Sequence, residues 1–336
     1  MGADLFSDPF GELSPILVHE DLQLLGGRFR FESNSRQLLS LVDAAYGGLP
    51  RHRMSAPVPR LRLRLLLTSG QYSSRRSEPP PLAMLSGAGF LGGATDSSNF
   101  VVLSPRERAG LVVVSPQMLR FPYHARYELL EFAVFTLAAR VQALVPLHAA
   151  CVGRGSRGLL LMGPGGSGKS TVALQCLLQG FDFLSEDSVF VAPDSMLATG
   201  VANFLHVRSD SLRWLARGRD VTAIRKSPVI RRRSGARKFE VDLRRGDHRL
   251  AASPLKIVAL VFLSQQSAGG RPLLKSLPKS ALLANLTTAQ AYAANQPEWT
   301  TFSKSVSGLD GFELRRGRHP LEAVEALREL LGSAAR

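Results

Sequence analysis

Residues 163–170 constrain the fold of this chain more than any other segment. They read Gly-Pro-Gly-Gly-Ser-Gly-Lys-Ser and fit the phosphate-binding pattern G-x-x-x-x-G-K-[ST] at every fixed position. The apolar run 159–162 precedes them, and residues 170–179, apolar at helical spacing and followed by Gly180, come after them. These patterns predict a buried strand, a glycine-rich loop and a helix that ends at Gly180.

A loop of this kind binds phosphate through its backbone. Consecutive N–H groups point into one hollow, and the helix that starts at the end of the loop adds the positive end of its dipole. We expect Lys169 to reach the terminal phosphates and the Ser170 hydroxyl to bind a magnesium ion that bridges them. The expected nucleotide-binding residues are Gly163, Pro164, Gly165, Gly166, Ser167, Gly168, Lys169, Ser170 and Thr171.

The composition is that of a globular protein. The chain has 336 residues, of which 45% are hydrophobic. The longest apolar stretch, 127–151, is interrupted by charged residues and a proline, so we expect no membrane span. The first residues show no signal-peptide pattern, and Cys151 and Cys176 are expected to be small buried thiols without a disulfide. These features predict a cytoplasmic protein.

The formal net charge of +15 suits acidic partners such as nucleotides, nucleic acid or an acidic peptide. Nearly all of the positive charge is arginine, which coding bias alone can produce. Nucleic acid is therefore not the partner that we expect.

The chain divides into three parts by composition. Residues 1–72 combine strand-like runs at 29–32 and 60–67 with a helical pattern at 36–45, which predicts a small α+β unit. The arginine row Arg60, Arg62 and Arg64 is typical of a solvated strand face. Residues 73–104 are rich in Ser, Arg, Pro and Gly, which predicts a linker or mobile loop, with a substrate lid as the alternative. Residues 105–336 contain the phosphate loop and are expected to form one α/β domain.

Two further sets of polar residues are expected near the loop. The glycine-rich residues 153–158 join the run 146–152 to the strand that enters the loop, which predicts a hairpin that brings His148 close to it. Glu186 and Asp187 lie between two apolar runs, where carboxylates are costly to bury without a cation, and a nucleotide-bound magnesium would supply one. The alternatives are a solvated turn for the two acids and a core histidine for His148.

The position of the acidic pair differs from that in GTPases and motor ATPases. Glu186 follows Lys169 by only 17 residues (186 − 169). The apolar run 257–263, where such an acid would be sought, ends in Ser264, Gln265 and Gln266 without a carboxylate. An ordinary ATPase is therefore disfavoured.

The run from His148 through the loop to Glu186 and Asp187 resembles the core of the HPr kinase/phosphorylase family, whose nucleotide site is related to that of phosphoenolpyruvate carboxykinases. The resemblance covers residues 148–192. It implies that Lys169 holds the transferred phosphate and that His148 helps to orient the phosphates. It also implies that Ser170 and Asp187 hold magnesium, and that Glu186 takes the proton from the attacking hydroxyl. The family kinases usually have Asp where this chain has Glu186, and their Glu-Ile-Arg-Gly-type segment is not recognisable here.

Residues 231–243 combine a basic cluster with an alternating strand pattern. Two functions are considered for this cluster, closure over ATP phosphates or binding of an acidic peptide, because arginine binds phosphate and carboxylate in a bidentate way. Arg237 and Lys238 are the candidates for substrate contact; an exposed basic loop that leads to a half-solvated strand is the alternative. His206 and His248 lack metal-ligand spacing and are expected to be structural or exposed. Residues 320–331 predict an amphipathic helix that covers the core.

The residues and the resemblance together predict a kinase with an α/β core of the HPr-kinase/phosphoenolpyruvate-carboxykinase type and a smaller N-terminal α+β unit. With ATP and Mg²⁺ as cofactors, it would transfer the γ-phosphate to a serine of a peptide or small protein. A small-molecule hydroxyl kinase, a catalytically weak nucleotide-binding regulator and a nucleic-acid binder are the alternatives. The family often forms oligomers, so a homo-oligomer is also expected.

Overall fold

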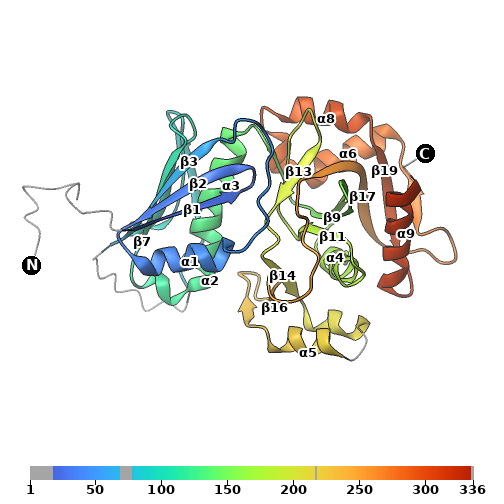
Figure 1. The fold of residues 1–336 in the computed structure, drawn as a ribbon. Coiled ribbons are helices and arrows are strands. Elements are labelled where there is room, and N and C mark those ends of the chain that lie inside the picture. The colour runs from blue at the N-terminus through green and yellow to red at the C-terminus, as the bar shows by residue number, and fades with distance from the viewer. Residues whose placement is uncertain (1–17, 69–77, 216–217, 334–336) are drawn as a thin grey trace, which may run out of the picture. The chain divides into compact units, whose positions relative to one another are not determined.

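The computed structural model describes residues 18–68, 78–215 and 218–333 (Figure 1). The expectation about an N-terminal signal falls outside these residues. The chain is a mixed α/β protein that forms two compact units. The first unit comprises Met1–Gly47 and Pro57–Gln142, and the second comprises Gly48–Ala56 and Ala143–Arg336.

The first unit contains a seven-stranded sheet of order β1-β2-β3-β7-β6-β5-β4. The pairs β2–β3 and β3–β7 are parallel, and the others are antiparallel. Two main helices, α1 (Arg36–Tyr46) and α3 (Glu131–Val141), pack against the sheet. The strands are β1 (Val18–Leu24), β2 (Gly27–Ser33), β3 (Arg60–Leu67), β4 (Ala83–Gly87), β5 (Phe90–Asp96), β6 (Asn99–Ser104) and β7 (Ala109–Val114). The short turns η1 (Met118–Arg120), α2 (Pro122–His124) and η2 (Ala125–Leu130) lead into α3. The strands and the α1 helix predicted in 1–72 are confirmed.

The expected linker is wrong for residues 83–104, because they form the three strands β4, β5 and β6. The glycines that indicated flexibility instead permit close packing: a Cβ at Gly92 would lie 2.8 Å from the carbonyl oxygen of Val101 on the neighbouring strand. Residues 73–77 of the expected linker lie outside the described ranges. The boundary between the units falls after Gln142 rather than near residue 105, because β6 and β7 complete the first sheet.

The second unit contains a nine-stranded sheet. Its main path is β11-β9-β10-β17-β13-β12-β8, and β19 pairs with β17 and β18. The strand β10 runs parallel to β17, and β17 runs parallel to β19. The strands are β8 (Val145–Leu147), β9 (Ala150–Arg154), β10 (Arg157–Met162), β11 (Asp182–Ser185), β12 (Val189–Val191), β13 (Leu197–Gly200), β17 (Leu255–Ser267), β18 (Leu274–Ser276) and β19 (Asp310–Arg316). The predicted β9–β10 hairpin is confirmed.

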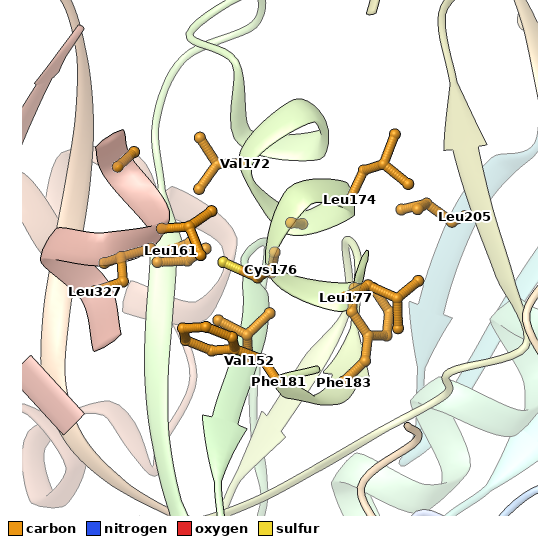
Figure 2. Close-up of a cluster of buried hydrophobic side chains, with 14 of the residues drawn as sticks. Val152, Leu161, Val172, Leu174, Cys176, Leu177, Phe181, Phe183, Leu205 and Leu327 are labelled. Atoms are coloured by element: carbon orange, nitrogen blue, oxygen red, sulfur yellow. The ribbon is translucent and has the colours of Figure 1, made fainter. Parts of the chain in front are cut away.

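Helices cover both faces of this sheet, as the alternation along β10 shows. Leu159 and Leu161 lie in one buried cluster with side chains of α4 (Lys169–Leu178) and α9 (Pro320–Ser333), as Figure 2 shows for α4 and Leu327. Leu160 and Met162 lie in a second cluster. It includes side chains of α6 (Lys279–Ala289), α7 (Ala291–Ala294) and α8 (Trp299–Ser307). The predicted C-terminal helix therefore packs on the core. Cys176 belongs to the first cluster and Cys151 to the second, and both are buried free thiols.

A small antiparallel sheet of order β14-β16-β15 adjoins α4 through β14 (Phe204–Val207). Its other strands are β15 (Val229–Arg231) and β16 (Arg237–Asp242), and η3 (Ser209–Trp214) and α5 (Arg219–Lys226) lie between β14 and β15 in the chain. Leu205 of β14 belongs to the same buried cluster as α4, which fixes the small sheet beside the phosphate loop. No helix in the described ranges has both the length and the apolar character needed to cross a membrane.

Candidate nucleotide-binding site

The loop between β10 and α4 has the backbone that its sequence pattern predicts. Gly166 and Gly168 have φ angles of 78° and 99°, in the left-handed region that side chains disfavour. The N–H of Ser167 donates to the carbonyl of Pro164 at 3.1 Å and closes the turn. The Ser167 hydroxyl is buried and has no hydrogen-bond partner in the described chain. A bound oxyanion would satisfy this hydroxyl, so the loop fits a phosphate group.

Three predicted site residues meet at the start of α4. Nζ of Lys169, the first residue of α4, donates to Oδ1 of Asp187 at 2.7 Å. Nδ1 of His148 lies 3.2 Å from the same oxygen, and its Nε2 lies 3.4 Å from Lys169 Nζ. Burial by itself would raise the pKa of the Asp187 carboxyl, but the charge and the hydrogen bond of Lys169 outweigh it, and the pKa is lowered. Asp187 is therefore ionised at neutral pH.

The two hydroxyls that follow Lys169 have different surroundings. Ser170 is half-buried in the first turn of α4. Thr171 Oγ1 lies 3.0 Å from the hydroxyl of Ser211 in η3, so Thr171 already has a protein partner. Ser170 is thus the better placed of the two to meet a ligand.

The backbone of His148 is held by a side chain that is distant in the sequence. Gln290, between α6 and α7, accepts a hydrogen bond from the His148 N–H at 2.8 Å and donates one to the His148 carbonyl at 3.0 Å. His148 lies between β8 and β9, where the strand predicted for 146–152 is interrupted. The buried amide of Gln290 therefore takes the place of a neighbouring strand at this residue. No local pattern in the sequence indicates this role.

Glu186 lies in a different environment from its neighbour Asp187. Its side chain is 6% exposed, and its Oε2 accepts the His206 N–H at 2.8 Å and lies 3.0 Å from His206 Nδ1. The other ring nitrogen of His206 lies 3.6 Å from Glu240. Burial raises the pKa of Glu186, but the hydrogen bonds and charge of His206 outweigh it and lower the pKa. The structure thus places Glu186 against His206; its role as acceptor of the proton from the attacking hydroxyl is what the resemblance implies.

The end of β17 lies beside the phosphate loop, because β17 pairs with β10 in parallel. A Cβ added at Gly163 would lie 3.0 Å from the carbonyl oxygen of Leu263, so the two backbones are close. Nε2 of Gln265 lies 3.5 Å from the carbonyl oxygen of Gly165. An amide therefore stands where a conventional ATPase would carry its metal-binding acid. In the described ranges no three His, Cys, Asp or Glu side chains form a metal cluster.

The β15–β16 hairpin separates the two basic residues that the sequence proposed for substrate. Lys238 is half-buried and is close enough to Glu186 and Asp187 for their charges to act on it. Arg237 is exposed and is paired in register with Arg231 at the hairpin end. Arg232, which the sequence did not single out, has Nη2 3.1 Å from Nδ1 of His206. Strand alternation decides which basic side chain faces the site.

The comparisons with known proteins add little. The chain matches no protein-family model, and it matches no curated protein in sequence. Among solved structures it is similar to the Hpr(Ser) kinase/phosphatase from Coxiella burnetii, with 12% identity over 56% of this chain and 93% of that chain. The TM-score is 0.28, which does not establish a shared fold.

Proposed function

We propose that this protein is an ATP- and magnesium-dependent kinase that transfers the γ-phosphate to a hydroxyl, with a serine of a peptide or small protein as the acceptor class. One observation carries the proposal: the Lys169 ammonium, the Asp187 carboxylate and the His148 imidazole converge at the mouth of a glycine-rich loop. Phosphoryl transfer needs positioning and charge stabilisation more than covalent chemistry, and these groups supply both.

Each residue has a role that follows from its position. The loop N–H groups and the Ser167 hydroxyl bind phosphate oxygens, and Lys169 binds the terminal phosphates. Ser170 and Asp187 would hold magnesium, an ion that typically takes one or two protein ligands and keeps phosphate and water as the rest. When bound, the ion neutralises charge that develops on the phosphates. His148 positions Asp187 through Nδ1 and Lys169 through Nε2, and the resemblance implies that it helps to orient the phosphates.

The role of Glu186 as proton acceptor stays a prediction from the resemblance. Its contacts with His206 favour a second candidate function, a nucleotide-binding regulator with little turnover. The two functions differ in one measurable property, which is transfer of the γ-phosphate to a second molecule.

The test is incubation with magnesium, γ-labelled ATP and lysate from the source cells, followed by detection of label in proteins, peptides and small molecules. Lys169→Met removes the ammonium and keeps the length of the side chain, and Gln296→Leu, in an exposed hydrogen bond to Tyr292, serves as a matched control. The kinase proposal expects label with the wild type and Gln296→Leu but not with Lys169→Met. ATP binding without label in any fraction would overturn the kinase and leave the regulator.

A further inference from the structure

The side chains of Arg232 and Lys238, beside the site, form no ion pair with a carboxylate among the described residues. Asp187 is paired with Lys169, and Glu186 and Glu240 both lie against His206. Within the described chain, neither Arg232 nor Lys238 lies at ion-pair distance from any acid. Both side chains are half-buried, where an uncompensated charge is costly. An anion that is not part of the protein would remove this cost.

The hairpin geometry explains why these two residues face the site. On β16, Lys238 and Glu240 are two residues apart and therefore share one face of the strand. Glu240 lies 3.6 Å from the His206 ring, which in turn contacts Glu186 beside the phosphate loop. Arg232 reaches the same ring from the other arm of the hairpin, and its buried Nε has no hydrogen-bond partner in the described chain.

The charged groups near these two cations show which part of the site they lie close to. Lys238 is within electrostatic range of Asp187 and Lys169, and Arg232 is within range of Asp187 and His148. Lys169 of such a loop binds the terminal phosphates of a nucleotide, not the base or sugar. The two hairpin cations therefore lie at the terminal-phosphate end.

We propose that Arg232 and Lys238, on the β15–β16 hairpin, form a second anion subsite that binds the terminal phosphoryl group of a nucleoside triphosphate. The guanidinium offers a planar set of donors and the ammonium a compact charge, which together match a tetrahedral dianion. The subsite distinguishes a triphosphate from a diphosphate. This inference deepens the proposed function and rests on it for the identity of the nucleotide, but it is tested by binding alone.

The experiment compares Lys238→Met and Arg232→Gln with Arg225→Gln, a control that removes an exposed positive charge from the neighbouring helix α5. Isothermal titration calorimetry, with magnesium in the buffer, measures the affinity of each protein for the non-hydrolysable analogue adenylyl imidodiphosphate and for ADP. Each site variant is expected to weaken the analogue by about tenfold or more and ADP by less than about twofold, because ADP lacks the group that the subsite binds. The control is expected to change both affinities equally and by less than about twofold.

Equal weakening of the two ligands by Lys238→Met, or no weakening, would overturn the subsite. Thermal unfolding of each variant shows whether it is folded, and Lys238→Arg, which keeps the charge, is expected to recover most of the selectivity. A wild type that transfers phosphate but shows no selective loss in the variants refutes the subsite and leaves the kinase intact. If the variants lose affinity selectively for the analogue but the wild type transfers no phosphate, the subsite is supported and the kinase is refuted.

Discussion

Replacement of Gln290 by leucine tests whether this buried amide positions His148. Leucine fills a similar volume, so the substitution removes the two hydrogen bonds to the His148 backbone without opening a large cavity. The net contribution of one such bond is about 1 kcal/mol, so the loss of both should lower the free energy of unfolding by about 2 kcal/mol. For a unit of this size, that is about 4–8 °C in Tm.

The functional effect should act through His148 alone. Once its backbone is released, the imidazole no longer stays within 3.2 Å of Asp187, and we expect the rate of transfer to fall by about tenfold. Hydrogen exchange at the His148 amide should also become faster, because its acceptor is lost. The control is Gln296→Leu, which removes an exposed hydrogen bond and should change neither quantity.

A double-mutant cycle decides between positioning and general destabilisation. In a His148→Ala background, Gln290→Leu should still lower the Tm but should not lower the rate of transfer further. If the rate falls by the same factor with and without the imidazole, Gln290 does not act through His148 and the reasoning is refuted.

Three more predictions follow from the site. Gly168→Ala should weaken ATP binding measured by titration, because the φ of 99° at this position is strained for alanine; unchanged affinity would contradict the required turn. Glu186→Gln tests whether Glu186 acts as a base or as the partner of His206. If Glu186 is only a base, kcat should fall at unchanged Tm; if it also stabilises His206, the Tm should fall as well. Burial lowers the pKa of His206, but Glu186 and Glu240 outweigh it and raise the pKa above the usual 6.5. The stabilisation from charged His206 is therefore complete below pH 6.5 and is lost as the pH rises through its folded-state pKa. Urea unfolding at several pH values should show this loss in the wild type and not in His206→Gln; identical profiles would exclude His206 as its source.

The local patterns of the sequence predicted many of the strands and helices in both units. The alternation at 60–67, the apolar run before the loop and the stripe of 320–331 each match one element of the structure. The patterns work here because each element buries one face, and burial imposes a period on its residues. The hairpin before the loop was predictable for the same reason, since glycines separate two apolar runs.

Composition predicted the structure poorly where glycine allows close packing of strands and does not indicate a flexible segment. Residues 83–104 form three strands although they contain many small residues, because the sheet brings backbones close together at Gly92. The contacts of the site residues depend on pairings between distant segments. Gln290 reaches His148 across 142 residues, and the register of β15 with β16 turns Lys238 inward and Arg237 outward. No local pattern in the sequence predicts contacts between such distant residues.

The ion pair between Lys169 and Asp187 explains how the free protein keeps both groups ready for a ligand. The Asp187 oxygen that accepts the ammonium is one that a cation would bind, so both cannot hold it together. The Lys169 side chain is 10% exposed and that of Asp187 is 39% exposed, so water screens the attraction only from the side of the carboxylate. The phosphate groups of a nucleotide would offer Lys169 more negative charge than the single carboxylate does, so a bound nucleotide could take the ammonium from Asp187. The pair therefore holds the side chains in position without competing strongly with the ligand.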